Sequence, residues 1–264
     1  MHSAGAWVLK CPSCGFLAST LSPGIGTGID GLEALRRHNY ERMFDRIELL
    51  KPLKGARVLE VGSAWGWFLA AAERRGTLPQ GIEPDEANAN LARAAGHRVD
   101  IGYFPDDLTT DGLYDIIVLN DVFEHIPAPA QFVRKIEARL APGGLVVLNC
   151  PSSNGIFFRL AKLLNSLGVS GPYERLWQND YPAPHVSYFN PSNLQRLVER
   201  NSGLREVTRF RLSSVTRAGL SKRVWDSKRK IVSTLMVGSI WCLSFVQGFL
   251  PPDIEVNVFR KGEL

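Results

Sequence analysis

Residues 57–83 contain the feature that most constrains the fold: an apolar stretch, a glycine-bearing turn, a helix, and a short strand that ends in an acid. The apolar residues at 58–61 are typical of a buried parallel strand. Gly62 and Gly66 allow the chain to turn sharply and bring its backbone close to a ligand. Glu83 follows Gly62 by 21 residues, a position from which an acid can accept hydrogen bonds from ribose hydroxyls. The segment therefore predicts a βαβ unit that binds a nucleoside.

The spacing of the glycines narrows the choice of ligand. A dinucleotide-binding turn reads G-x-G-x-x-G, whereas this turn reads G-S-A-W-G and is preceded by Glu60. It resembles motif I of class I S-adenosylmethionine-dependent methyltransferases, normally E/D-x-G-x-G-x-G, although Ala64 replaces the middle glycine. The resemblance implies S-adenosyl-L-methionine as the cofactor, with Glu60 near its methionine end. The residues expected to hold it are Glu60, Gly62, Ser63, Ala64, Gly66, Glu83, Pro84, Phe104 and Asn120. Taken alone, this segment is also compatible with a tight turn in some other α/β protein.

Later segments support the same interpretation. A helix and a third strand at 98–101 are expected after Glu83. Residues 114–127 and 140–149 resemble the FDVIVLNDVLEH and LKPGGxLVLxxP stretches of ubiquinone-biosynthesis-type and related small-molecule methyltransferases. The resemblance implies an α/β fold: a Rossmann-like, doubly wound, seven-stranded sheet whose last strand is antiparallel, with apolar helical insertions. The sixth and seventh strands are expected at 205–214 and 254–260.

Length and composition fit one catalytic domain. A chain of 264 residues with 45% hydrophobic content can bury a full doubly wound sheet. We expect a methyltransferase domain over 31–264, after an irregular or zinc-ribbon-like segment over 1–30. The formal net charge of +5 is modest and predicts no nucleic-acid partner. Four cysteines without a secretory signal predict a reducing, cytoplasmic location.

A C-x-x-C knuckle lies in the first segment. Cys11 and Cys14 are followed by Gly15, a spacing at which two thiolates can bind one zinc ion. A closed zinc site needs four ligands, and Cys150 and Cys242 are far along the chain. The segment resembles the second half of the four-cysteine ribbon of sugar and natural-product methyltransferases. We expect no bound metal and interpret the knuckle as a truncated or decayed ribbon, or as one whose first half lies upstream. A redox function is a weaker alternative.

Two apolar segments outside the sheet are candidates for covering the ligand. The spacing of apolar residues in 31–50 predicts one or two amphipathic helices. In related enzymes such a segment lies across the cofactor pocket, and packing on the sheet edge is the simpler alternative. The insertion at 152–184 carries an apolar helical stripe and then an aromatic-rich turn, which predicts either an acceptor lid or a plain packing helix.

Three residues are candidates for handling the methyl acceptor. Transfer to a hydroxyl requires positioning of the acceptor and removal of its proton, and histidine is the natural base near neutral pH. His125 follows the fourth strand at the carboxyl edge of the sheet, where ligands bind. His185 lies in a proline-stiffened loop that resembles the H-x-x-Y-F-(S/T) element of the acceptor side, which adds Tyr188. Alternatively, His125 ties its loop to a neighbouring helix and His185 fixes its own loop. Asn190 is expected to cap the following helix.

The insertion at 215–252 is the most unusual part of the sequence. A basic cluster begins at Arg217, and residues 231–250 then contain no charged side chain. That length meets the criterion for a membrane span, but the last strand must return to the same sheet. We therefore expect an interfacial contact of 217–250 with the inner face of the membrane. A hydrophobic lid or dimer interface and a buried core helix are the alternatives.

Together these patterns predict an S-adenosylmethionine-dependent methyltransferase acting on a small-molecule or lipid-linked acceptor. A hydroxyl of a glycan, sugar or quinone-like compound is the favoured methyl acceptor. The alternative from another class is a catalytically silent relative that keeps the fold as a binding or scaffold subunit. A nicotinamide-dependent reductase is a third interpretation, which the glycine spacing disfavours.

Overall fold

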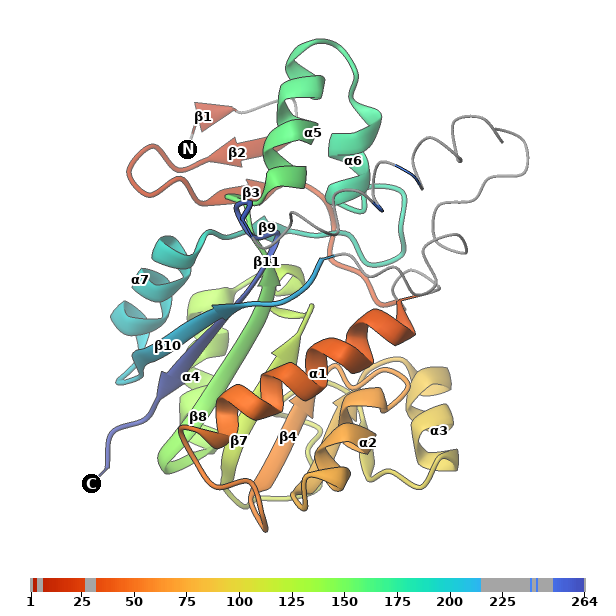
Figure 1. Cartoon of the computed structure of the whole chain (residues 1–264), viewed down its shortest axis with the longest axis vertical. Coiled ribbons are helices and arrows are strands. Elements are labelled where there is room, and N and C mark those ends of the chain that lie inside the picture. The colour runs from red at the N-terminus through yellow and green to blue at the C-terminus, as the bar shows by residue number, and fades with distance from the viewer. Residues whose placement is uncertain are drawn as a thin grey trace.

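The computed structural model describes residues 2–3, 7–26, 32–214, 238, 241 and 249–263. Its centre is a seven-stranded sheet in the order β10–β11–β8–β7–β4–β5–β6 (Figure 1). The parallel strands are β4 (Arg57–Val61), β5 (Leu78–Glu83), β6 (Val99–Ile101), β7 (Tyr114–Asn120) and β8 (Leu140–Pro151). The antiparallel strand β11 (Ile254–Arg260) lies between β8 and β10 (Arg205–Arg211). The predicted fold class is confirmed.

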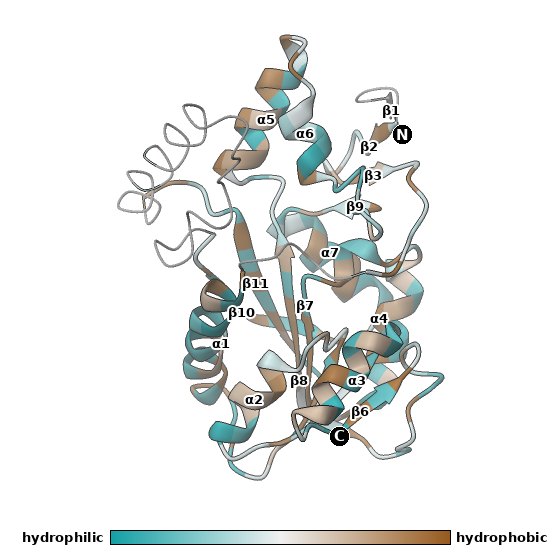
Figure 2. Ribbon diagram, turned by 90° about the vertical axis from the view of Figure 1, so that its right-hand side faces the viewer, coloured by the Kyte–Doolittle hydropathy of each residue, from teal (hydrophilic) through white to brown (hydrophobic). Residues whose placement is uncertain are grey.

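Helices cover both faces of this sheet, as Figure 2 shows with α1 on one side and α4 and α7 on the other. One face packs against α1 (Glu33–Glu48), α2 (Trp67–Arg74) and α3 (Glu86–Ala94). The other packs against α4 (Pro129–Arg139) and α7 (Pro191–Asn201). Neighbouring residues of one strand, such as Val58 and Leu59, enter opposite cores, because successive side chains of a strand point to opposite faces.

Two local predictions can be compared directly with these elements. Segment 31–50 forms the single helix α1, which packs on the sheet through Met43 and Phe44 and also brings Arg36 to a cavity. Asn190 caps α7 as expected: its side chain accepts from the Asn193 N–H, and the Asn193 side chain accepts from the Asn190 N–H, both at 2.9 Å. This reciprocal pair fixes where α7 begins.

A second, smaller sheet lies beyond the carboxyl ends of the parallel strands, beside two further helices (Figure 1). Its strands run in the order β1 (His2–Ser3), β2 (Val8–Lys10), β3 (Leu17–Ser19) and β9 (Ser187–Tyr188). The helices α5 (Ile156–Ser166) and α6 (Gly171–Leu176) come from the predicted insertion 152–184. Their buried side chains form a third core with β2, β3 and Tyr188. The segment predicted as ribbon-like is thus joined to the loop that carries His185.

The insertion predicted at 215–252 falls almost entirely outside the described residues, so its contacts stay a prediction. Of the residues near its end, Phe249 is 90% exposed. No helix in the part of the chain that the structure describes combines the length and apolar character needed to cross a membrane.

Candidate active site

The turn between β4 and α2 depends on two glycines with positive φ. Gly62 has φ +74° and Gly66 has φ +78°, a conformation that side chains with a Cβ rarely adopt. A Cβ on Gly62 would lie 2.6 Å from Val122 Cγ2. Gly66 is the N-cap of α2, so the first N–H groups of this helix are available at the turn. Ala64, where the sequence departs from the glycine pattern, also has a positive φ of 43°. Its methyl group is therefore tolerated in the left-handed region.

Glu83 connects this turn to the next loop. Its Oε2 accepts a hydrogen bond from the Ala64 N–H at 2.8 Å, and its Oε1 accepts from the Asp85 N–H at 3.0 Å. Burial raises the pKa of Glu83, and these two backbone hydrogen bonds act in the opposite direction. Each oxygen keeps a further lone pair, so the carboxylate can hold both loops and still accept from a ligand hydroxyl.

Glu60 lies deeper, below the same turn. It is 2% exposed; its Oε1 accepts from the Asn120 amide at 2.9 Å, whereas its Oε2 has no hydrogen-bond partner among the residues that the structure describes. Burial raises the pKa of Glu60 well above its usual value. The buried Ser63 hydroxyl is unpaired as well, and both residues line a small cavity with Arg36. Unpaired buried oxygens are costly, so these groups are suited to the hydrogen-bond donors of a ligand.

A cavity of about 770 Å³ opens beside this turn, within the range of roughly 300–1,000 Å³ typical of ligand sites. Several predicted residues line it: Gly62, Ala64, Glu83, Pro84, Phe104, Asn120 and His125. Glu60 and Ser63 line the small adjoining cavity instead. Gly66, His185 and Tyr188 line neither cavity.

Sequence reasoning missed several cavity residues. Arg36 lies on α1 and pairs with Asp121 at 3.2 Å. Gln131 and Lys135 lie on α4, and Lys135 pairs with Asp106 at 3.0 Å. Segment 23–26, just after the small sheet, also lines the cavity. The amphipathic pattern of 31–50 could have indicated Arg36, whereas no local signal distinguishes 23–26 from an ordinary glycine-rich loop.

His125 forms part of the cavity wall. It ends the short 3-10 turn η1 (Phe123–His125) that follows β7. Its Nδ1 lies 2.9 Å from the Pro184 carbonyl oxygen, an acceptor, so Nδ1 carries the proton and Nε2 has a free lone pair. Burial lowers the pKa of His125, which favours the neutral ring. The hydrogen bond joins η1 to the proline-stiffened loop, whereas the structural alternative expected a tie to a neighbouring helix.

His185 and Tyr188 lie behind His125 rather than in the cavity. The His185 ring is 4.8 Å from that of His125, centroid to centroid, and the residue is only 6% exposed. Burial, with a smaller effect from His125, lowers the pKa of His185 to about 3. The Tyr188 hydroxyl donates to the Leu176 carbonyl at 3.2 Å. Both residues are therefore placed to support the wall.

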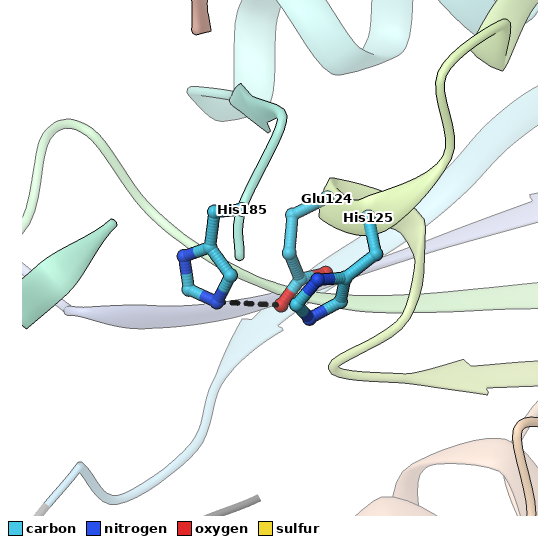
Figure 3. A group of neighbouring side chains, drawn as sticks. All are labelled: Glu124, His125 and His185. Carbon is cyan, nitrogen blue, oxygen red and sulfur yellow. Dashed lines mark ion pairs between the residues drawn. The ribbon is translucent and has the colours of Figure 1, made fainter. Parts of the chain in front are cut away.

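Glu124 is a buried acid that was not selected from the sequence. Its side chain points towards His185, with Oε1 3.9 Å from His185 Nε2 (Figure 3). Glu124 is 1% exposed, and neither carboxylate oxygen makes a hydrogen bond with another described residue. Burial raises its pKa well above the usual value.

The cysteine knuckle forms the turn between β2 and β3. Cys11 and Cys14 are free thiols, and the Cys11 Sγ lies 3.2 Å from the Ser13 hydroxyl. Among the described residues, the group of potential metal ligands with three members is Glu124, His125 and His185, and neither cysteine belongs to it.

The sheet order, the antiparallel β11 and the glycine turn at the end of β4 define the fold of class I methyltransferases. The sequence places the chain in the same group: the family model described as "Methyltransferase domain" matches residues 35–208. The protein therefore belongs to the methyltransferase-domain family of S-adenosylmethionine-dependent enzymes.

Individual relatives share only modest sequence identity with the chain, over part of its length. The chain is 32% identical over 120 residues to a ubiquinone biosynthesis O-methyltransferase of Paramagnetospirillum magneticum, covering 43% of this chain and 48% of that protein. It is 28% identical over 165 residues to the enzyme of the same name from Coxiella burnetii, covering 60% and 68%. The chain thus spans about half the length of the first of these relatives. Magnesium protoporphyrin IX methyltransferase of Synechocystis PCC 6803, solved with bound SAH, has a TM-score of 0.58 at 11% identity, covering 90% of each chain. This likeness concerns the fold alone.

Proposed function

We propose that the protein transfers a methyl group from S-adenosyl-L-methionine to a hydroxyl of a small-molecule or lipid-linked acceptor, with a quinone-like phenol as the favoured class. The observation that carries this proposal is the single cavity of about 770 Å³. One side of it is formed by the glycine turn and Glu83, and another by His125. A donor and an acceptor can therefore meet in one cavity, as an in-line displacement requires.

The donor side fits the cofactor of the family. Glu60 Oε2 and Ser63 Oγ are buried without hydrogen-bond partners among the described residues. The ammonium group of S-adenosylmethionine would donate hydrogen bonds to them, directly or through water. Glu83 has lone pairs for ribose hydroxyls, and glycine at position 62 lets the turn lie close to Val122, where a Cβ would clash at 2.6 Å. The cofactor supplies an electrophilic methyl group; the protein residues bind and orient it and exclude water.

The acceptor side favours a partly apolar molecule. Val122, Ile126 and Phe132 line the cavity near His125, and Ile25 approaches from the segment after β3. Apolar side chains beside a few polar groups are suited to an aromatic ring that presents its hydroxyl to His125. The names of the ubiquinone O-methyltransferase relatives support the same acceptor class. The apolar residues near His125 are better suited to an aromatic ring than to a free sugar, so we rank the sugar lower.

The test begins with donor binding. Calorimetric titration of the full chain with S-adenosylmethionine should show one site, weakened at least about tenfold by Glu60→Gln. Glu73→Gln, an exposed substitution on α2, is the matched control. No binding at millimolar donor, with the protein folded, would rule out the methyltransferase proposal.

Acceptors are then compared with radiolabelled donor. We expect label in short-chain polyprenyl catechols and little in free sugars. Donor binding without transfer to any phenol, quinol or sugar hydroxyl would instead support the catalytically silent relative.

A further inference from the structure

We propose that Glu124, His125 and His185 form a binding site for one divalent transition-metal ion of the zinc type. Each residue offers one ligand atom, and these atoms all lie within 4.8 Å of one another. In a tetrahedral zinc site with bonds near 2.1 Å, ligand atoms are about 3.3 Å apart. The ligand atoms therefore need to approach one another by up to about 1.5 Å around an ion, through rotation of the three side chains.

The burial of the group is the second observation. Glu124 is 1% exposed and His185 is 6% exposed. Both Glu124 carboxylate oxygens and His185 Nδ1 have no hydrogen-bond partner among the described residues. A buried polar group without a partner is destabilising, and Figure 3 shows the Glu124 carboxylate directed towards the two rings. A cation at this point would satisfy the carboxylate and take up an imidazole lone pair.

Backbone hydrogen bonds hold the ligands together from two separate segments. The Glu124 carbonyl accepts from the Val186 N–H at 3.0 Å and from the Ser187 hydroxyl at 3.2 Å. His125 Nδ1 lies 2.9 Å from the Pro184 carbonyl. The η1 turn and the 184–187 loop are thus fixed side by side. Contacts of this kind around the ligands keep a metal site preorganised.

The ligand types favour zinc over magnesium. Two imidazole nitrogens and one carboxylate form the set found at three-ligand zinc sites that keep an open position. Magnesium prefers oxygen ligands in octahedral geometry.

The role of the ion rests on the proposed function, whereas its binding does not. His125 lines the cavity, so an ion held by all three residues lies at the cavity wall. There it can bind the acceptor oxygen and lower the pKa of that hydroxyl. The hydroxyl proton leaves to solvent, and the new O–C bond forms as the S–C bond of the donor breaks.

The experiment measures metal binding and does not depend on methyl transfer. The untagged full chain is stripped with a chelator, dialysed against zinc chloride, and analysed for zinc by mass spectrometry and calorimetry. We expect one equivalent per chain. Glu124→Gln and His185→Asn should each lower the zinc affinity at least about tenfold. Magnesium chloride should bind more weakly.

Two control variants separate this site from others. His38→Asn removes an exposed histidine, and Cys11→Ser with Cys14→Ser removes the knuckle; both should keep the full equivalent. Circular dichroism and donor titration show whether each variant is folded. The proposal is overturned if the unmodified protein binds no zinc. It is equally overturned if zinc is lost with the knuckle and kept in folded Glu124→Gln and His185→Asn.

Discussion

The donor and acceptor sides of the cavity are built in different ways. The donor side comes from residues 60–66 and Glu83, at the carboxyl ends of two adjacent parallel strands, and much of it is backbone. The acceptor side joins η1 to a loop 60 residues away through the small sheet, in which β3 pairs with β9. Sheet geometry fixes the first side. The second depends on packing between segments that are remote in the sequence, so substitutions should affect the two sides separately.

We expect His125→Ala to show the largest difference between its effect on methyl transfer and its effect on donor binding. Loss of the polar group at the acceptor wall should lower the methyl-transfer rate about 10³-fold, the middle of the range for removing a catalytic proton-handling group. The donor Kd should change less than about twofold, because the donor side keeps its glycine turn and Glu83. Single-turnover rates and donor titration measure the two quantities. His38→Asn is the control, and an equal loss of donor binding in His125→Ala would contradict the separation.

Trp177→Ala tests the packing of the acceptor side. Trp177 is fully buried and packs edge-to-face against Trp7 and Tyr188, with ring centroids 5.6 and 4.9 Å away. Its removal should lower the free energy of unfolding of this region by about 3 kcal/mol. Hydrogen exchange should show faster exchange in β2, β3 and α6, and unchanged protection in β4 and β7.

The control for this substitution lies in the same part of the molecule. Leu167, at the end of α5, is 71% exposed, so Leu167→Ala should change stability by less than about 0.5 kcal/mol. If Trp177→Ala destabilised β4 as strongly as β3, the two sides would form one cooperative unit and the comparison would fail.

Gly62→Ala tests the donor side alone. Its new Cβ would approach Val122 at 2.6 Å and narrow the cavity at the turn. We expect donor affinity to fall about tenfold, or about 1.4 kcal/mol. Gly55→Ala is the matched control: Gly55 has φ +76°, like Gly62, and no atom within 4 Å of the added Cβ. Equal losses in both variants would show that backbone strain, and not the cavity, controls donor binding.

The sequence predicted the donor side in detail because its signals are local. Gly62 and Gly66 are needed because the turn has positive φ at both positions, and glycines are visible in the sequence itself. Glu83 follows at the distance that a strand, a helix and a second strand require. The order of the apolar strands predicted the sheet. Ala64 departs from the glycine pattern but still adopts a positive φ, so the turn keeps its shape.

The acceptor side was predicted only in part because its neighbours are remote. His125 and His185 were both selected, but nothing local shows that one lines the cavity and the other is buried behind it. Glu124 is next to His125 in the sequence, but its side chain points towards His185, in a loop about 60 residues away. The pairing of β3 with β9, which decides where segment 23–26 lies, depends on tertiary packing that periodicity does not report.

Asp253 offers the smallest expected effect, and it tests how the acceptor side is attached to the sheet. It precedes β11, and its Oδ1 accepts from the Phe157 N–H at 2.7 Å, in the first turn of α5. Burial, only partly offset by this hydrogen bond and one from Ser214, raises the pKa of Asp253 from 3.8 to about 6. Between these two pH values the folded protein binds more protons at this site than the unfolded chain does. The stability that Asp253 contributes is therefore greatest below about pH 4 and is lost as the pH rises through 6.

Asp253→Asn removes this titration and keeps an oxygen for the Phe157 N–H. A shift of two pKa units corresponds to about 3 kcal/mol, and partial solvent screening of this half-buried group reduces our expectation to about 1 kcal/mol. Relative to the unmodified protein, the Asn variant should thus gain about 1 kcal/mol of stability between pH 4 and 7. Urea unfolding at both pH values measures the difference, with the exposed substitution Asp111→Asn as control. A pH-independent difference would mean that Asp253 does not link α5 to β11 through a buried carboxyl. Hydrogen exchange shows where the gain in stability arises. If α5 exchanged more slowly while the exchange of β4 stayed unchanged, the link between Asp253 and α5 would stabilise the acceptor side alone, as the difference between the two sides requires.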